Sequence, residues 1–277
     1  MNKTAFVTGA SSGIGEATVT RLLADGYTVF AAARRMARMA SLEKAGAILV
    51  PLDLTDDASI VAAVEAVRAQ AGRFDLLVNN AGYGSYGALE DVPLDEARRQ
   101  CEVNLFGLAR LCQLTLPMMR TQKSGRIINI TSIGGKMHEP FGAWYHATKF
   151  AVEGLSDCLR MEVKPFGIDV IIIEPGAIRT EWTDIAKDSL LERSGTTAYS
   201  SYARRHAAMF AQMDTSTMVS PPAVIASAIA KAASVRRPRT RYATGGGARP
   251  ILFLRRWLSD RMFDRLMWRI SQSAKPV

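Results

Sequence analysis

The glycine-rich segment after the first apolar run constrains the fold more than any other part of the chain. Residues 3–8, KTAFVT, have the composition of a buried strand, and Gly9, Gly13 and Gly15 follow them directly, ahead of an apolar periodic stretch through Leu23. Glycines are needed where a backbone approaches a pyrophosphate closely, and the helix N-terminus behind them offers free N–H groups and a positive dipole end. The order therefore predicts a phosphate-binding βα unit, although a plain tight turn also uses glycines.

The same order of strand and helix repeats along the chain. Apolar runs of strand length alternate with stretches of helical periodicity, which predicts a parallel sheet covered by helices on both faces. We expect an α/β fold, a Rossmann-like doubly wound parallel sheet in a single domain with a C-terminal helical extension. The expected strands cover 3–8, 27–33, 47–52, 74–78, 126–131, 168–173 and 241–244. The first expected helix ends near Leu23. Further helices are expected over 56–71, 94–103, 104–120 and 145–166, and another is expected to start at Ser220-Pro221, with Ser220 as its N-cap.

Two arginines follow the second strand, where a dinucleotide fold meets the adenosine ribose. An acidic residue there would bind the 2′-hydroxyl and repel a 2′-phosphate, but the sequence has Arg34 and Arg35. Because a guanidinium binds phosphate well, we predict NADP(H) as the cofactor, with Arg34 as the main phosphate partner and Arg38 as a helper. NAD(H) stays open, since these arginines could also be solvated at the start of the next helix.

Small and polar residues end the next two strands. Asp53 follows the third strand, where it could accept a hydrogen bond from the adenine amino group, and Thr55 is the expected N-cap of the helix over 56–71. The fourth strand ends in 79–82, Asn-Asn-Ala-Gly. These residues fit a backbone that passes close to a ligand.

A serine and a Tyr-x-x-x-Lys pair frame the segment 129–149. On a helix, Tyr145 and Lys149 lie on one face about one turn apart. A phenol titrates near pH ~10, so it is a poor base at neutral pH unless a cation stabilises the phenolate, and Lys149 is placed to do so. The hydroxyl of Ser132 would orient the same substrate oxygen. Taken alone, the pair could also be a surface pair on an amphipathic helix.

With these motifs in one order, the chain resembles the short-chain dehydrogenase/reductase family. The motifs are TGASSGIG (8–15), Asp53, NNAG (79–82), Asn104, Ser132, YHATK (145–149) and the Pro-Gly of 175–176 followed by Thr180. The resemblance covers about residues 3–245, and the arginine-rich tail is similar to that of 17β-hydroxysteroid and retinol dehydrogenase-like members.

The resemblance implies a role for each matching residue. Tyr145 would be the general acid/base, Lys149 would bind the nicotinamide ribose and lower the pKa of the phenol, and Ser132 would position the substrate oxygen. Asn104 would hold a water that links Lys149 to solvent. The implied cofactor-binding residues are Gly9, Ser11, Ser12, Gly13, Ile14, Gly15, Arg34, Arg35, Asp53, Asn80, Ala81, Gly82, Tyr145, Lys149, Pro175, Gly176, Ile178 and Thr180. Many NADP-using relatives carry a basic residue where this chain has Ser12, so the NADP preference rests on Arg34 and its neighbours.

The segment 176–220 stands where the family has its substrate lid. It is rich in large apolar side chains: Trp182, Leu190, Leu191, Tyr199, Tyr202, Met209, Phe210 and Met213. An apolar substrate of the steroid, retinoid or fatty ketone type suits this composition, and packing of a long insertion on the core suits it equally. We expect His138 at the rim of the cleft or in solvent, because no acid has suitable spacing to pair with it. The predicted function is hydride transfer between NADP(H) and a hydroxyl/ketone pair; the alternative is a non-catalytic NADP(H)-sensing or membrane-recruited binding module.

The excess positive charge lies near the C-terminus. The net charge is +9, and from Arg236 to Arg269 ten arginines stand against two acids. The tail has apolar residues about every four positions, which predicts one or two amphipathic helices. It could pack over the substrate cleft, contact another subunit or attach peripherally to an anionic membrane. We therefore divide the chain into a domain over 1–248 and a basic amphipathic extension over 249–277.

The composition is that of a globular protein, with 48% hydrophobic and 22% charged residues in a chain of 277. We see no leader and no apolar run of spanning length, so we expect a cytoplasmic enzyme. Cys101, Cys112 and Cys158 lack the spacing of metal ligands or of a disulfide framework, so we expect buried thiols and no metal. The expected partners are a small-molecule substrate and further copies of the chain, and not nucleic acid, because the body has no basic face interleaved with aromatic residues.

Overall fold

The computed structural model describes residues 3–215 and 218–274. Within them, seven parallel strands form one sheet in the order β3-β2-β1-β4-β5-β6-β7. The strands are β1 (Thr4–Thr8), β2 (Thr28–Ala33), β3 (Ile48–Pro51), β4 (Leu76–Asn79), β5 (Gly125–Ile130), β6 (Ile168–Pro175) and β7 (Arg241–Thr244). The strand order reverses direction between β1 and β4, so the prediction of a doubly wound Rossmann-like sheet is confirmed.

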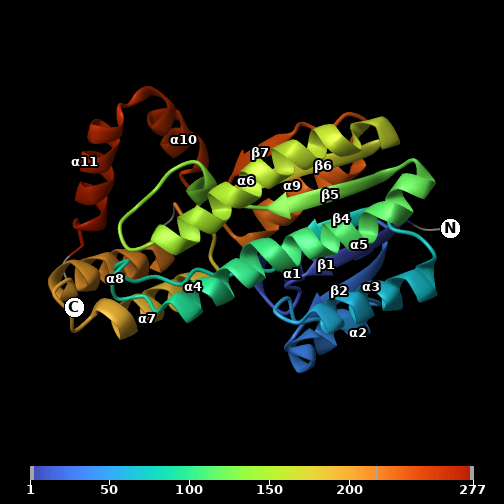
Figure 1. Cartoon of the computed structure of the whole chain (residues 1–277), viewed down its shortest axis with the longest axis horizontal. Coiled ribbons are helices and arrows are strands. Elements are labelled where there is room, and N and C mark those ends of the chain that lie inside the picture. The colour runs from blue at the N-terminus through green and yellow to red at the C-terminus, as the bar shows by residue number, and fades with distance from the viewer. Residues whose placement is uncertain (1–2, 216–217, 275–277) are drawn as a thin grey trace.

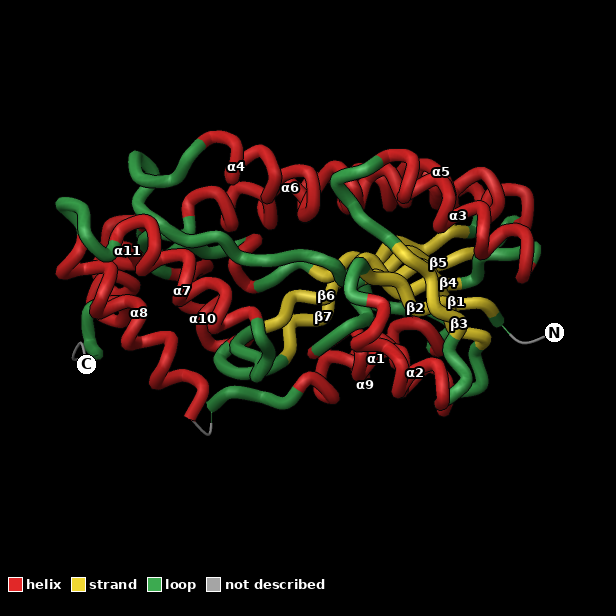
Figure 2. Tube along the Cα trace, turned by 90° about the horizontal axis from the view of Figure 1, so that it is seen from below, coloured by secondary structure: helices red, strands yellow, loops and turns green. Residues whose placement is uncertain are grey.

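Helices cover both faces of the sheet (Figure 2). They are α1 (Gly13–Ala24), α2 (Ala40–Lys44), α3 (Asp57–Ala71), α4 (Leu94–Cys101), α5 (Gly107–Gln122), α6 (Ala143–Val163), α7 (Trp182–Ser194), α8 (Ser200–Thr215), α9 (Pro222–Ser234), α10 (Ala248–Trp257) and α11 (Asp260–Ser271). A π-helix covers Glu102–Phe106, and short 3-10 helices cover Met36–Met39, Ile133–Gly135 and Lys164–Phe166. Figure 2 shows α1, α2 and α9 below the sheet and α3, α5 and α6 above it.

The apolar patterns of the strands and helices explain these layers. All five residues of β1 are buried, as expected for a central parallel strand with a helix layer on each side. Alternate side chains enter two separate cores: Val7 packs with Leu22 of α1 and Ile229 of α9, while Phe6 packs with Val64 of α3 and Leu111 of α5.

Three local predictions differ from the structure. Asp56, and not Thr55, is the N-cap of α3, because its carboxylate accepts the backbone N–H of Ala58 at 3.0 Å. Ser220 does not cap α9, whose N-cap residue is Pro221, because the backbone of Ser220 bonds to Ala177 instead. The helices predicted over 94–103 and 104–120 form one continuous rod, in which the π-helix joins α4 to α5.

The prediction of three buried thiols holds only for Cys112. Cys101 is half-buried and Cys158 is exposed. Cys158 lies in α6, where one side of the helix faces solvent, so its position in an apolar-looking run did not indicate its burial.

Two helical pairs extend the molecule beyond the carboxyl ends of the strands (Figure 1). The lid, α7 and α8, packs around Tyr86 and Tyr145, and the tail, α10 and α11, packs on Met137 through Phe263 and Met267. The tail thus covers the body of the protein, as the first of the three interpretations expects. The predicted division at residue 248 stays a prediction, although α10 begins at Ala248. The predicted ranges 1–248, 176–220 and 249–277 include 1–2, 216–217 and 275–277, which lie outside the described residues.

Within the described part of the chain, none of the helices combines the length and apolar character that crossing a membrane requires.

Candidate active site

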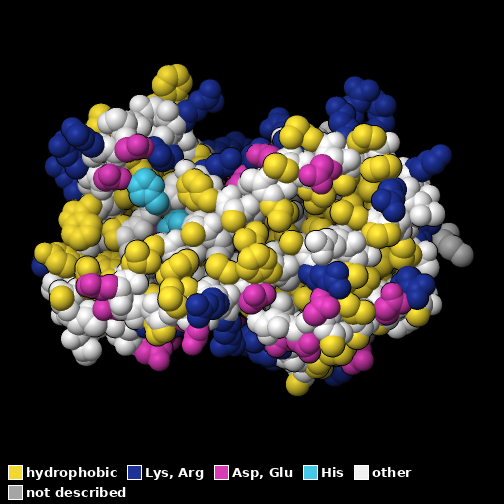
Figure 3. All heavy atoms as spheres, in the orientation of Figure 1, with side chains coloured by type: hydrophobic (Ala, Val, Ile, Leu, Met, Phe, Trp, Pro, Cys, Tyr) yellow, Lys and Arg dark blue, Asp and Glu magenta, His cyan; other side chains and the backbone are white. Residues whose placement is uncertain are grey.

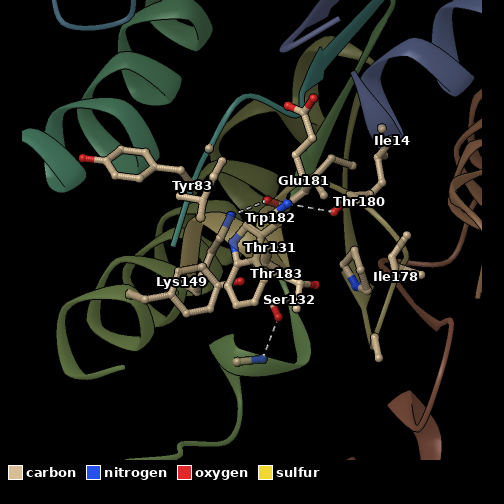
Figure 4. A pocket seen from close by; sticks show the side chains of 18 of the residues that line it. Ile14, Tyr83, Thr131, Ser132, Lys149, Ile178, Thr180, Glu181, Trp182 and Thr183 are labelled. Carbon is tan, nitrogen blue, oxygen red and sulfur yellow. Dashed lines mark hydrogen bonds between the residues drawn. The ribbon is translucent and has the colours of Figure 1, made fainter. Parts of the chain in front are cut away.

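A cavity of about 850 Å³ lies at the carboxyl ends of the central strands. Such a position is where doubly wound sheets bind ligands, and this volume suits a cofactor with a small molecule beside it. The glycine turn, the ends of β2, β4 and β5, the start of α6, the lid and the tail all contribute to its wall. Figure 4 shows Ile14 and Ile178 on one side of this cavity and Lys149 on the other.

The glycine turn forms one end of the cavity, and its backbone adopts conformations that only glycine takes up easily. Gly9 and Gly13 have φ of +67° and +58°, a region that suits glycine. A Cβ on Gly15 would lie 2.2 Å from the carbonyl oxygen of Gly9, so this glycine closes the turn and does not line the cavity. Ser12 precedes α1 without a capping hydrogen bond from its side chain. The first turn of α1 is therefore available to an anion.

Arg35, and not Arg34, makes the direct contacts beside this turn. Its guanidinium donates to the hydroxyls of Ser11 and Ser12 at 3.3 and 3.2 Å and pairs with Glu181 at 3.1 Å. Arg38 also pairs with Glu181. Arg34 lines the cavity near Asp53, where hydrogen bonds from Thr55 and the charge of Arg34 outweigh burial and lower the pKa of the Asp53 carboxyl.

Most of the predicted cofactor-binding residues meet at this cavity. Together with Arg34, Arg35 and Asp53, they are Gly9, Ser11, Ser12, Gly13, Ile14, Asn80, Ala81, Gly82, Tyr145, Lys149, Pro175, Gly176, Ile178 and Thr180. Asn80 ties two strand ends together, since its side-chain amide donates to the carbonyl oxygen of Thr8 at 2.8 Å.

Tyr145, Ser132 and Lys149 lie together on the same wall. Tyr145 is 7% exposed. Burial raises the pKa of its phenol well above the ordinary value, while the neighbouring Ser132 hydroxyl lowers it. Because burial dominates, the net direction is opposite to the depression that the Tyr-Lys pair predicts. Nζ of Lys149 donates to the carbonyl oxygen of Ile130 at 3.0 Å and lies 5.9 Å from the centre of the Tyr145 ring.

Lys149 is held in an unusual environment for an ammonium group. It is 6% exposed, and burial lowers its pKa to about 8, although the charge of Glu153 raises it. Lys149 is therefore a buried cation at pH 7, and its desolvation lowers the free energy of unfolding.

Asn104 stands behind this wall and does not line the cavity. Its side-chain amide donates to the carbonyl oxygen of Tyr83 at 2.9 Å and accepts the N–H of Tyr83 at 3.0 Å. The residue lies in the π-helix, an irregularity that often occurs at functional sites. Its oxygen lies 3.1 Å and Nζ of Lys149 lies 3.6 Å from the point where a Cβ on Gly82 would be. Asn104 and Lys149 therefore flank the same glycine.

The other half of the cavity is apolar. Its wall combines Trp182, Met209, Phe210 and Met213 of the lid with Met137, and with Ile251, Met267 and Ile270 of the tail. Sequence reasoning assigned eight lid residues to this cleft or to packing. These four line the cavity, while Leu190 is buried in the lid and Leu191 and Tyr202 are exposed. Sequence reasoning also offered packing of the tail over the cleft as one of three interpretations, and Ile251, Met267 and Ile270 place the tail in the cavity wall.

The sequence analysis did not predict three features in or near the site: the positions of Glu181 and Glu139 and the acidic partner of His138. Glu181 and Glu139 both line the cavity, and no local motif marked them. His138 has an acidic partner after all, because its Nε2 lies 2.8 Å from Oδ1 of Asp264 in α11, 126 residues later. Pairs this distant in sequence depend on the tertiary fold.

With this geometry established, the chain can be compared with known proteins. The family model described as short chain dehydrogenase matches residues 3–190. The chain belongs to the short-chain dehydrogenase family. It is thus a member of a family of oxidoreductases, while a 17β-hydroxysteroid or retinol dehydrogenase-like subtype stays a prediction.

Individual short-chain dehydrogenases support this assignment. The 3-ketodihydrosphingosine reductase of Bacteroides thetaiotaomicron is 42% identical over 180 residues, which are 65% of each sequence. The NADPH-dependent 3-dehydrocapnine reductase of Ornithobacterium rhinotracheale is 32% identical over 279 aligned residues, 96% of each sequence, so the similarity includes the tail. The crystal structure of a short-chain dehydrogenase from Streptomyces avermitilis superposes with a TM-score of 0.76, 37% identity and 91% coverage of each chain.

Proposed function

We propose that the protein is an NADP(H)-dependent oxidoreductase that transfers a hydride between nicotinamide and a hydroxyl/ketone pair on a small, apolar substrate. One observation carries this proposal. A single cavity joins the glycine turn and its arginines to Ser132, Tyr145 and Lys149, and continues into an apolar wall.

The residues at the glycine end fit a phosphorylated dinucleotide. The turn leaves space for a pyrophosphate before α1, and a Cβ on Gly13 would lie 2.9 Å from the side chain of Thr180. Arg34 and Arg35 stand where a 2′-phosphate needs cations. NAD(H) remains an alternative cofactor, because the Arg35 and Arg38 side chains are partly occupied by Glu181. When bound, the reduced cofactor supplies a hydride to the carbonyl carbon.

Tyr145 would supply the accompanying proton. Because burial keeps its phenol protonated at neutral pH, the residue suits a general acid that protonates the carbonyl oxygen during reduction. Ser132 would bind the same oxygen, and the charged Lys149 would stabilise the phenolate left on Tyr145. Asn104 would position the water through which Lys149 and Tyr145 regain a proton.

The apolar wall supports a fatty ketone as the substrate. Methionine and aromatic side chains offer an adaptable surface for an alkyl chain. Both relatives compared above are named as reductases, of a 3-keto and of a 3-dehydro compound. We therefore propose reduction as the main direction and give the fatty ketone precedence over a steroid or retinoid.

The test is NADPH oxidation with methyl ketones of increasing alkyl length. We expect kcat/KM to rise with chain length, because each added methylene that enters the apolar wall contributes up to ~0.8 kcal/mol. Tyr145→Phe should remove turnover and keep NADPH binding. Retained turnover in this variant would refute the mechanism, and tight NADPH binding without turnover of any ketone would support the non-catalytic sensing module instead.

A homo-oligomer is a further proposal for the partners of this protein. The π-helix between α4 and α5 exposes Phe106 at 54%, and α6 exposes Phe150 and Met161 at 45 and 67%. A second copy could cover these side chains. Phe150→Asp should then lower the sedimentation coefficient, and an unchanged oligomer would exclude α6 as the contact.

The outer face of the tail supports a peripheral membrane contact of a cytoplasmic protein. Phe253 and Trp257 are 63 and 69% exposed, and Arg256 beside them is exposed as well. Figure 3 shows basic and apolar side chains close together over these helices, at the upper left. Vesicles with phosphatidylserine should pellet the protein, and vesicles of phosphatidylcholine alone should not. Equal pelleting of a Trp257→Ala, Phe253→Ala double variant would contradict this.

A further inference from the structure

A carboxylate stands inside the apolar half of the cavity. Glu139 lines the wall next to Tyr86 and Tyr145, and it is only half-buried because it faces the cavity. The hydroxyl of Tyr86 donates to Oε1 of Glu139 at 2.7 Å, and Tyr86 itself is fully buried. The backbone N–H of Glu139 donates to Nε2 of His146 at 3.3 Å. The residue is thus held in place by two neighbours.

The carboxylate of Glu139 has no ion-pair partner in the described part of the chain, although Arg265 and Glu139 both line a second, smaller pocket. Among residues 3–215 and 218–274, none of the ion pairs includes Glu139. His146 directs neither ring nitrogen at the Glu139 carboxylate: its Nδ1 lies 2.8 Å from the carbonyl oxygen of Gly134, and its Nε2 accepts the backbone N–H of Glu139. Burial lowers the pKa of His206, which stacks on Tyr86, so this imidazole is neutral at pH 7.

Aromatic rings surround the space in front of Glu139. The ring of Tyr86 lies 5.7 Å from that of Trp182 and 5.3 Å from that of Phe210, both nearly perpendicular to it. The rings of Tyr145 and Trp182 are 5.1 Å apart. All four line the same cavity. Several ring faces beside one carboxylate are a recognised arrangement for an ammonium group.

The position of Glu139 also matters for the chemistry. Its negative charge is one of the causes that raise the pKa of Tyr145, after burial. With an uncharged ketone, this charge opposes the phenolate that forms on Tyr145 during reduction. A positive charge on the substrate would offset it.

We infer that this part of the cavity binds an ammonium group, so that the substrate is an apolar ketone with a protonated or quaternary amine close to its carbonyl. This inference rests on the proposed ketone reduction and names the substrate class. Glu139 supplies the opposite charge, the fully buried Tyr86 fixes the carboxylate, and Trp182 and Phe210 supply ring surface.

The test compares two ketones of the same shape. One is a decyl ketone with a trimethylammoniomethyl group, whose charge does not depend on pH, and the other is neopentyl decyl ketone, in which carbon replaces nitrogen. The ratio of their kcat/KM values with NADPH is measured for the wild-type protein, for Glu139→Gln, and for Glu162→Gln as an exposed matched control on α6. The amide introduced by Glu139→Gln retains an acceptor for the hydroxyl of Tyr86, so the comparison isolates the charge.

We expect the ratio to favour the cationic ketone in the wild type and to fall about tenfold or more in Glu139→Gln, with no change in Glu162→Gln. Because it is a ratio, it cancels any general loss of activity and any intrinsic difference in ketone reactivity. An equal ratio in all three proteins would overturn the inference and leave the reductase intact.

A second measurement needs neither turnover nor a variant. Calorimetric titration of the wild-type protein with NADP⁺ present should show decyltrimethylammonium binding at least about tenfold more tightly than the uncharged decyldimethylamine oxide. Equal or weaker binding of the cation would overturn the inference. If neither ketone were reduced while the cation still bound selectively, the proposed function would fail and the ammonium site would stand.

Discussion

Nη2 of Arg35 lies 3.1 Å from Oε2 of Glu181, the residue that immediately precedes the first lid helix. The hydrogen bond from Arg38 keeps the pKa of the Glu181 carboxyl below its ordinary value, so this side chain is an anion. Because it pairs with Arg35 and Arg38, it competes with a 2′-phosphate for the guanidinium of Arg35 and for that of Arg38, the predicted helper.

Glu181→Gln should therefore tighten NADPH binding about threefold to tenfold and change NADH binding little, because the phosphate no longer competes with a carboxylate. Fluorescence titration of both cofactors measures the effect. A Glu192→Gln change in α7, the helix that Glu181 precedes, should alter neither affinity. Equal tightening of NADH would show that Glu181 acts on the lid and not on the phosphate.

Arg35→Ala should weaken NADPH about tenfold or more relative to NADH, since it removes a guanidinium that also fixes the hydroxyls of Ser11 and Ser12. Arg34→Ala tests the sequence-based preference for the neighbouring residue. If only Arg34→Ala weakens NADPH binding relative to NADH binding, then Arg34 and not Arg35 binds the 2′-phosphate.

The pH dependence of stability should reveal the buried Lys149. Its pKa is about 8 in the folded protein against 10.5 as the ordinary value, so between these values the unfolded chain binds more protons. The free energy of unfolding of the wild type therefore rises with pH through this window. Relative to Lys149→Met, it should gain about 2 kcal/mol between about pH 7 and about pH 9.5. Urea unfolding at several pH values measures this, and exposed Lys44→Met should show no such trend.

Phe263→Ala should loosen the tail. Its ring is fully buried beside Met137 and packs 5.3 Å from the ring of His138, so truncation should cost about 3–5 kcal/mol of local stability. Faster amide exchange in α11 and a higher KM for long-chain ketones would report it. Phe253→Ala, at a position 63% exposed, is the matched control. An unchanged KM in Phe263→Ala would mean that the tail wall does not contact substrate.

The parts of the fold predicted from sequence are those fixed by neighbours along the chain. The alternation of strands and helices predicted the parallel sheet, and the spacing of Tyr145 and Lys149 predicted that both side chains lie on one face of a helix. Contacts between distant residues could not be predicted this way. The pairing of Glu181 with Arg35, of Tyr86 with Glu139 and of His138 with Asp264 depends on how the lid and tail fold back over the sheet. Arg34 as the main phosphate partner stays a prediction. The contacts of Arg35 with Ser11 and Glu181 could not be predicted, because neighbouring side chains at a strand end point in different directions.

The wall of the cavity is drawn from Gly9 at one end of the chain to Ile270 near the other. During synthesis on the ribosome, every strand from β1 to β6 and the whole Tyr-Lys helix emerge before α11 exists. The nucleotide half can therefore form first, and the chamber for the apolar molecule is completed only after residue 270 has left the exit tunnel. A nascent chain would acquire its cofactor site before it could discriminate between substrates.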